Sequence, residues 1–250
     1  MPYKYSFVLL TLSLAGCAQR PSEEPNFELH VAAATNLSEV LPELNRAFTG
    51  ESGASIISSF GATAQLAQQI ENGGPFDVFL AADTEHVDAL VRNGVVESKA
   101  IYARGELVIW TLARTDIHSI QDLARLDVRG IAVAKPELAP YGRAAVEAMK
   151  SATLWASLQS KVVYAQNISA TRTYVETGNC DAAFTALSLV IHKPGQYVRV
   201  DPSGYLPIDQ ALCVSVRSKN LRVARRYAKF LLGMAARPIW QSYGYGLPGR

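Results

Sequence analysis

Short apolar runs alternate with amphipathic stretches along most of this 250-residue chain. The apolar runs have the length of buried strands, and the amphipathic stretches follow the 3.6-residue period of a helix. This alternation predicts an α/β architecture with mainly parallel sheets. The predicted strands are Glu28–Ala34, Ser55–Phe60, Val78–Ala81, Leu107–Leu112, Ile131–Ala134, Val162–Tyr164, Ala182–Thr185, Tyr197–Val200 and Leu212–Val216. The predicted helices are Ser38–Thr49, Ala64–Asn72, Glu85–Asn93, Ser119–Arg125, Arg143–Ser151, Ala170–Thr177 and Leu221–Leu232.

No linker divides the chain cleanly, so two lobes would have to be woven, with the chain crossing between them and returning. The strands Leu107–Leu112 and Leu212–Val216 are the predicted crossings. We therefore expect residues 27–107 plus 212–250 to form lobe 1, and residues 108–211 to form lobe 2.

The first residues have the pattern of an export signal. An apolar run over residues 7–14 follows one lysine and is too short to cross a bilayer, which needs roughly 20 residues. It ends in Leu14-Ala15-Gly16-Cys17, which resembles the cleavage site of bacterial lipoproteins, where the cysteine becomes the acylated N-terminus. We expect residues 1–16 to be a lipoprotein signal peptide and residues 17–26 a polar tether. An ordinary secretory peptide or a buried first helix is the alternative.

The composition excludes several classes of protein. Lys and Arg total 24 against 22 Asp and Glu, so nothing favours nucleic-acid binding or broad contact with a membrane surface. The four histidines are scattered without the spacing of metal ligands, and no metal site is expected. Cys180 and Cys213 lie in apolar or near-strand segments, so we expect two separate buried thiols; a disulfide between them stays open.

Four predicted junctions between a strand and a helix carry small polar residues or glycine. The first N–H groups of a helix lack intrahelical partners, and the helix dipole makes that end attractive to anions. Ordinary helix capping would explain any one junction, but open α/β sheets bind ligands at the carboxyl ends of their strands. Four junctions together favour an anion site. They are Thr35-Asn36, Phe60-Gly61-Ala62-Thr63, Pro140-Tyr141-Gly142 and Gln166-Asn167-Ile168-Ser169.

The chemistry of these junctions favours one kind of anion. Neither Thr35-Asn36 nor Gly61-Ala62-Thr63 contains a carboxylate that could accept a proton from an anion such as hydrogen phosphate. Charge-assisted hydrogen bonds from uncharged donors can still hold a dianion, so a fully ionised tetrahedral oxyanion fits best. No Gly-x-Ser-x-Gly or P-loop motif and no nucleophile–base pair is visible, and we expect a binding protein rather than an enzyme.

Several segments resemble the periplasmic molybdate-binding proteins of ABC importers. The resemblance covers essentially the whole chain after the tether, and its segments are specific together although each is weak alone. The matching segments are Ala32–Leu37 (AAATNL), Ser59–Leu66 (SFGATAQL), Gly74–Asp83 (GPFDVFLAAD), Asp181–Ser188 (DAAFTALS) and Tyr243–Pro248 (YGYGLP).

The resemblance implies a type II periplasmic-binding-protein fold, with two woven lobes, parallel-rich sheets and a hinged cleft. It implies that Thr35 and Asn36 supply hydroxyl and amide contacts to the anion, and that Thr63 occupies the position of a family serine. Tyr141 and Ile168 are implied to contribute backbone N–H groups from the opposing lobe.

One position departs from the family pattern. Many members place a tyrosine hydroxyl on the late strand where this chain has Ala186. A fifth side-chain donor is therefore in doubt, and the Thr35-Asn36 pair is the expected compensation. The sequence does not say what replaces that tyrosine.

The function implied by the resemblance is capture of molybdate and tungstate for an ABC permease with its ATPase. We expect a monomer that needs no cofactor, binds molybdenum only as its oxyanion, and is exported to the periplasm or cell surface with a lipid on Cys17. A receptor for another tetrahedral oxyanion, such as sulfate, is the leading alternative. An exported hydrolase on the same scaffold and an interaction-only lipoprotein are weaker ones.

Overall fold

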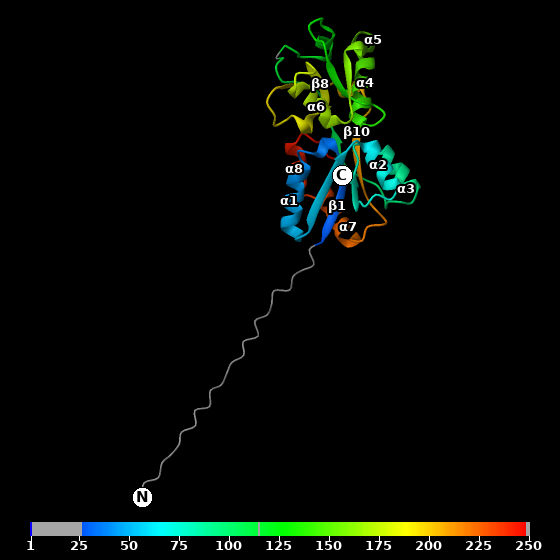
Figure 1. Ribbon diagram of the computed structural model, residues 1–250, viewed down its shortest axis with the longest axis vertical. Helices are drawn as coiled ribbons and strands as arrows, with labels where there is room; N and C mark the ends of the chain where they lie inside the picture. Colours follow the sequence, from blue (N-terminus) through cyan, green and yellow to red (C-terminus); the bar gives the residue numbers. More distant parts are fainter. Residues whose placement is uncertain (2–26, 115, 249–250) are drawn as a thin grey trace.

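The protein consists of two stacked lobes, each with its own sheet and helices (Figure 1). The structure is a computed structural model of the chain, and it describes residue 1, residues 27–114 and residues 116–248. Helices α1 and α7, which lie far apart in the sequence, belong to the same lower lobe in this view. The predicted signal peptide, Cys17 and the predicted tether lie outside the described residues.

Lobe 1 surrounds a five-stranded sheet with the order β2-β1-β3-β10-β4. Strand β1 pairs in parallel with β2 and β3, whereas β10 pairs antiparallel with β3 and β4. The strands are β1 (Glu28–Ala34), β2 (Ser55–Gly61), β3 (Val78–Leu80), β4 (Ala100–Gly105) and β10 (Ile208–Val214). The helices are η1 (Thr35–Leu37), α1 (Leu41–Ser52), α2 (Thr63–Glu71), α3 (Glu85–Arg92), α7 (Leu221–Leu232) and α8 (Arg237–Ser242).

Lobe 2 repeats this plan around a sheet with the order β7-β6-β8-β5-β9. Strand β6 pairs in parallel with β7 and β8, and β5 pairs antiparallel with β8 and β9. The strands are β5 (Leu107–Thr111), β6 (Ile131–Ala134), β7 (Val162–Ala165), β8 (Ala182–Ala186) and β9 (Gln196–Arg199). The helices are η2 (Ile120–Ala124), α4 (Pro140–Ser151), α5 (Trp155–Leu158), η3 (Gln159–Lys161), α6 (Ile168–Glu176), η4 (Leu187–Leu189) and η5 (Pro202–Gly204).

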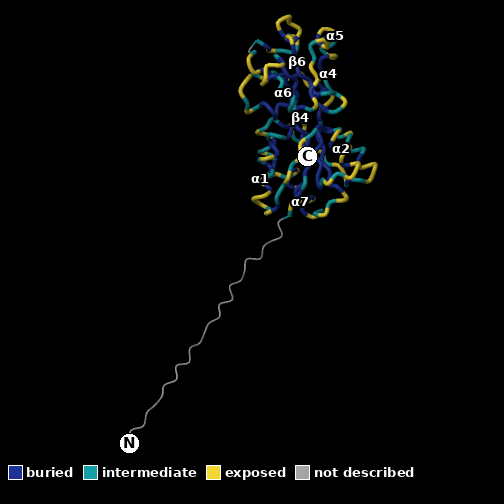
Figure 2. Tube along the Cα trace, viewed as in Figure 1, coloured by how far each residue is buried: buried dark blue, intermediate teal, exposed yellow. Residues whose placement is uncertain are grey.

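Apolar residues at helical spacing explain how the helices cover the sheets. In α1, Leu41, Leu44 and Phe48 are fully buried and lie on one face of the helix. The Phe48 ring packs against Tyr227 and Phe230 of α7, with ring centroids 5.0 and 5.5 Å apart. Figure 2 shows the same pattern along the whole trace, with buried segments inside each lobe and at the junction between them.

The chain crosses between the lobes at two places. It leaves the first sheet at Gly105 and enters the second at Leu107, and it returns between Arg199 and Ile208. The lobe boundaries predicted from the sequence lie beside these crossings and stay predictions. Because β4, β5 and β10 meet here, residues at the ends of these strands can contact both lobes.

The predicted α/β fold with two sheets containing parallel strands is confirmed, but strand β4 was not predicted. Its burial does not alternate, because its pairing with β10 shifts register between Gln210 and Ala211. Strand β10 begins at Ile208, four residues before the predicted start. Its first residues include Asp209 and Gln210, which hide the apolar pattern of a strand.

Several helices also differ from the prediction at their ends. Residues 35–37 form a separate 3-10 turn, so α1 begins at Leu41 with Pro42 in its first turn. The helix predicted over Ser119–Arg125 is a 3-10 helix. Helices α4 and α6 begin earlier than predicted, at Pro140 and Ile168, which places the polar junctions inside their first turns.

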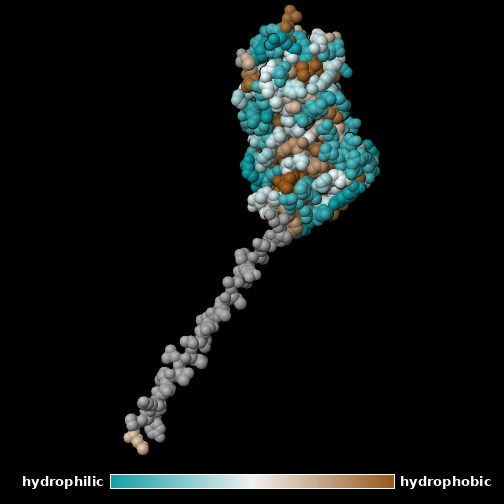
Figure 3. Space-filling model, viewed as in Figure 1, coloured by the Kyte–Doolittle hydropathy of each residue, from teal (hydrophilic) through white to brown (hydrophobic). Residues whose placement is uncertain are grey.

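The face shown in Figure 3 is largely hydrophilic, with apolar residues scattered over it rather than gathered into one broad patch. Within the described parts of the chain, no helix combines the length and apolar character needed to cross a membrane. Cys180 and Cys213 are both buried and free, which confirms the prediction of two separate thiols.

Replacing Gly105 by alanine should destabilise the protein by about 1–3 kcal/mol, the usual cost of overpacking a core. A Cβ at this position would overlap the Tyr141 hydroxyl and lie 2.5 Å from Gln210 Nε2. The matched control is Gly50→Ala in α1, where a Cβ meets nothing within 4 Å, and which should be neutral or stabilising. Urea unfolding of both variants is the measurement. Equal stability of the two variants would contradict the close packing at Gly105.

Candidate anion-binding site

A small cavity lies between the lobes, where four helices begin. Its volume is about 10 Å³, and residues of both lobes line it. Three of the predicted site residues, Thr35, Asn36 and Thr63, line it from lobe 1, and Tyr141 and Ile168 line it from lobe 2. The structure thus brings all five together, and their role as ligands stays a prediction. The complete lining is Ala34, Thr35, Asn36, Gly61, Ala62, Thr63, Ala82, Ala139, Pro140, Tyr141 and Ile168.

Strand register explains why residues far apart in sequence meet at this cavity. In lobe 1, parallel pairing sets Ala34 opposite Gly61, so β1 and β2 end side by side and lead into η1 and α2. In lobe 2, the same kind of pairing sets Ala134 of β6 opposite Ala165 of β7, before α4 and α6. Each lobe therefore directs two helix starts toward the cavity from the carboxyl ends of its parallel strands.

Most of these helix starts lack a side-chain cap. Helices η1, α2 and α4 begin without a capping hydrogen bond from a side chain. Only α6 is capped, since Asn167 Oδ1 accepts a hydrogen bond from the Ala170 N–H at 3.0 Å. Ordinary capping therefore accounts for one of the four polar junctions. At the others, first-turn N–H groups have no side-chain acceptor, although the Ala64 N–H of α2 donates to the Leu138 carbonyl.

The Thr63 hydroxyl is oriented as a donor. Its oxygen accepts a hydrogen bond from the Ala82 N–H at 3.2 Å, and the residue is buried. A hydroxyl that accepts from an N–H keeps its own proton for another partner. Thr63 lines the cavity, so that proton can be donated to an occupant there.

The cavity contains no charge of its own. None of its eleven lining residues, all within the described chain, is Lys, Arg, His, Asp or Glu. Nor do the described ranges contain any group of three or more His, Cys, Asp or Glu side chains that could hold a metal ion. Backbone and hydroxyl donors without a competing carboxylate can bind an anion.

Ion pairs join the lobes on both sides of the cavity. On the side of α1 and α6, Glu39 contacts Arg172 at 2.7 Å and Lys193 at 3.0 Å. On the side of α3 and α4, Arg143 contacts Glu85 at 2.9 Å and Asp83 at 3.3 Å. Figure 1 shows α6 on the α1 side and α4 on the α2–α3 side of the junction. These contacts connect the two lobes in this structure.

A backbone hydrogen bond also connects the lobes at the closed junction. The Ala64 N–H in the first turn of α2 donates to the Leu138 carbonyl at 3.3 Å, which links the two lobes through backbone.

Burial raises the pKa of Glu39, but hydrogen bonds and charge from Arg172 and Lys193 outweigh it and leave that pKa below its ordinary value. Glu39 therefore remains ionised in the closed protein at neutral pH.

A buried polar network lies behind the cavity, and the sequence analysis did not predict it. Its centre is Gln210 of β10, whose Oε1 accepts from Asn36 Nδ2 at 2.9 Å and from the Tyr102 hydroxyl at 2.7 Å. Gln210 Nε2 donates to the Tyr141 hydroxyl at 2.9 Å. One fully buried side chain thus touches predicted site residues of both lobes. The available signal was a glutamine directly before the apolar residues of the strand.

The C-terminal segment completes this network. The Tyr245 hydroxyl accepts from Asn36 Nδ2 at 2.9 Å and donates to the Asn36 carbonyl at 3.0 Å. Ser188, from lobe 2, also donates to that carbonyl, at 2.9 Å. Burial raises the pKa values of Tyr102, Tyr141 and Tyr245, so all three hydroxyls keep their protons.

The Asn36 side chain does not present its amide hydrogens to the cavity in this arrangement. Its Nδ2 atom donates to Gln210 and Tyr245, and its Oδ1 atom is buried without a hydrogen-bond partner among the described residues. Ala186, where many family members have tyrosine, is buried at the end of β8 and is absent from the cavity lining. The nearby hydroxyls of Ser188 and Tyr245 lie behind Asn36 instead.

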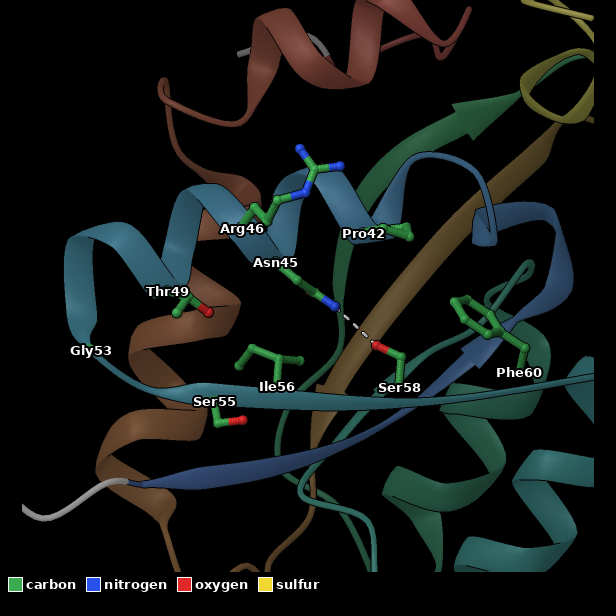
Figure 4. A pocket seen from close by; sticks show the side chains of 9 residues that line it. All are labelled: Pro42, Asn45, Arg46, Thr49, Gly53, Ser55, Ile56, Ser58 and Phe60. Carbon is green, nitrogen blue, oxygen red and sulfur yellow. Dashed lines mark hydrogen bonds between the residues drawn. The ribbon is translucent and has the colours of Figure 1, made fainter.

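A larger pocket, of about 670 Å³, lies elsewhere, between α1 and the edge strand β2 (Figure 4). It is an open surface groove in which Asn45 Nδ2 donates to Ser58 Oγ at 3.0 Å, while the Arg46 side chain points away from Ser58. Asn45 Oδ1 already accepts from the Tyr227 hydroxyl at 2.5 Å. These polar groups satisfy one another, so the groove does not offer the converging free donors of the small cavity.

Comparison with known proteins identifies the family. The model of the family described as bacterial extracellular solute-binding protein matches residues 29–246. The chain belongs to this family. The molybdate-binding protein ModA of Azotobacter vinelandii is 32% identical over 96% of this chain and 96% of its own length. ModA of Rhodobacter capsulatus is 33% identical over 87% of this chain and 88% of its own length.

Solved structures agree with this assignment. The periplasmic molybdate-binding protein of Azotobacter vinelandii superimposes with a TM-score of 0.86 and 28% identity, over 88% of this chain and 100% of that one. The resemblance to ModA proteins and the two-lobed binding-protein fold predicted from the sequence are confirmed. The matched proteins are binding proteins of transporters, in agreement with the expectation that the chain is not an enzyme.

Proposed function

We propose that this protein captures molybdate outside the cytoplasm and delivers it to an ABC importer. The observation that carries the proposal is an uncharged cavity between the lobes. Both lobes contribute helix starts to it, and lobe 1 adds the buried Thr63 hydroxyl. Relatives at 32–33% identity over most of the chain are molybdate-binding proteins. The predicted site residues Thr35, Asn36, Thr63, Tyr141 and Ile168 are the proposed donors.

Binding and closure are one process in this proposal. Lobe 1 offers the first turns of η1 and α2, and lobe 2 offers those of α4 and α6. An open cleft would leave the anion with donors on one side only, so the anion stabilises the closed state by contacts that the open state cannot complete. The ion pairs of Glu39 and Arg143 add to the closed state only when the lobes meet.

The proposal extends to tungstate, which has the charge, shape and nearly the size of molybdate. The protein would act as a monomer, need no cofactor and present its closed surface to a permease driven by an ATPase. Delivery requires no covalent chemistry, since the donors only bind and release the anion.

Calorimetric titration with molybdate, tungstate, sulfate and phosphate tests the function. Molybdate and tungstate should bind more tightly than sulfate, because donors fixed on two lobes cannot all reach a smaller dianion. Phosphate should bind weakest, since its proton finds no carboxylate among the cavity residues and an unpaired buried group costs about 1–3 kcal/mol. Sulfate binding as tight as molybdate binding would move the protein to the sulfate receptors.

Replacing Ile168 by proline should weaken molybdate binding about 10- to 100-fold, because it removes one N–H donor to a charged ligand. Ile168 is the first residue of α6, a position that tolerates proline, and Asn167 before it has the extended backbone that proline requires (φ −155°, ψ 175°). The control is Ile168→Val, which keeps the N–H and should bind normally. Equal affinities of the two variants would remove this N–H from the site.

We also propose that Cys17 carries the lipid that holds the protein at the membrane. The support is the sequence Leu14-Ala15-Gly16-Cys17 at the end of a short apolar run. In cells expressing the full chain, the wild type should label with a radioactive fatty acid and fractionate with membranes. The Cys17→Ser variant should not incorporate the fatty acid. It should either be soluble after export or keep its signal peptide uncleaved. Labelling of Cys17→Ser would contradict the assignment.

A further inference from the structure

In the hydrogen-bond network behind the cavity, one hydroxyl has a single proton but lies beside two acceptors. Another hydroxyl has a proton but no acceptor. Tyr102 has a single hydroxyl proton, yet its oxygen lies within bonding distance of two acceptors, the Ala81 carbonyl at 3.0 Å and Gln210 Oε1 at 2.7 Å. Tyr141 receives a hydrogen bond from Gln210 Nε2, while its own proton has no acceptor among the described residues. Asn36 Oδ1 has no partner either.

Exchanging the oxygen and nitrogen of two side-chain amides, those of Asn36 and Gln210, removes these three problems, and it requires the Tyr245 hydroxyl to change its acceptor. The two atoms of an amide are distinguished only by their hydrogen-bond pattern. After the exchange, the Gln210 NH2 group donates to Tyr102 and to the Asn36 oxygen, and the Tyr141 hydroxyl donates to the Gln210 oxygen. Tyr102 then donates its single proton to Ala81. Tyr245 donates its single proton to the Asn36 side-chain oxygen, and Ser188 remains as the donor to the Asn36 carbonyl.

The exchange also changes what faces the cavity. Asn36 lines the cavity, whereas Gln210 and Tyr245, which contact its other amide atom, do not. The unpartnered position therefore belongs to whatever occupies the cavity. An amide oxygen there would repel an anion, and an NH2 group there would donate to it. The two amides can only turn together, because Gln210 and Asn36 must present opposite atoms to each other.

We propose that Gln210 is a positioning residue for anion binding, which holds the Asn36 amide with its NH2 group toward the cavity when the anion is bound. This inference rests on the proposed function. Gln210 does not touch the anion. It acts through Asn36 of lobe 1, and its own orientation is set by the Tyr141 hydroxyl of lobe 2, so the donor is completed only when the lobes are closed.

A double-mutant cycle tests whether Gln210 acts through Asn36. Gln210→Met should weaken molybdate binding about 10- to 100-fold, the value of one hydrogen bond to a charged group. In the Asn36→Ala background the same substitution should change the dissociation constant by less than about threefold, because the donor it positions is already absent. Equal losses of affinity in both backgrounds would overturn the proposal, since Gln210 would then act only by supporting the fold or by contacting Tyr141.

The matched control is Tyr227→Phe. It removes another buried hydroxyl that bonds an amide, 2.5 Å from Asn45 Oδ1, outside the cavity lining. It should lower stability in urea unfolding while leaving the molybdate dissociation constant unchanged. A similar loss of affinity in Tyr227→Phe and Gln210→Met would mean that the effect is structural.

The wild-type protein provides a second test, in which a variant serves only to assign one signal. In ¹H–¹⁵N spectra, the side-chain NH2 pair of Asn36, assigned by its absence in Asn36→Ala, should shift on addition of molybdate and exchange more slowly with water. An unchanged Asn36 pair in molybdate-saturated protein would overturn the proposal. If the wild type binds none of the four oxyanions in calorimetry, the proposed function fails instead, so the two failures are distinguishable.

Discussion

The proposed site must hold a dianion in a cavity whose lining contains no positive side chain, and this constraint accounts for the rest of the architecture. Single uncharged donors are weak, so several must converge, and each must be fixed before the ligand arrives. Parallel pairing of β1 with β2 and of β6 with β7 meets this requirement, since it ends two strands of each lobe together and starts a helix beside each end. Since η1, α2 and α4 have no side-chain caps, no side chain competes for the N–H groups at their starts.

The charged residues around the cavity have a different role from the residues that line it. Glu39, Arg143 and Arg172 stand at the rim, where they connect the lobes and do not line the cavity. Partly exposed pairs of this kind are individually weak, so they bias the closed state slightly rather than lock it. A receptor that must release its ligand to a permease benefits from such a balance, because closure then depends mainly on the anion.

The sequence predicted the parts of the fold and site that depend on local patterns. Apolar runs and polar junctions located most strands, and all five predicted site residues reached one cavity. The residues at the crossing were not predictable in this way. Strand β4 and the start of β10 have irregular patterns because of a register shift at Gln210, and Gln210 is polar because it contacts both lobes. Contacts between residues 36, 141 and 210 exist only in the folded chain, so no local window contains them.

The contact between Asn36 and Tyr245 has a consequence for biogenesis. These residues lie 209 positions apart, and Tyr245 bonds both the side chain and the carbonyl of Asn36. A chain that emerges from a membrane channel with its N-terminus first cannot make this contact until residue 245 has emerged. The wall behind the cavity is therefore assembled last, and a partly translocated chain has no complete site. A receptor exported in this way would thus complete its site only after its C-terminal segment has crossed the membrane.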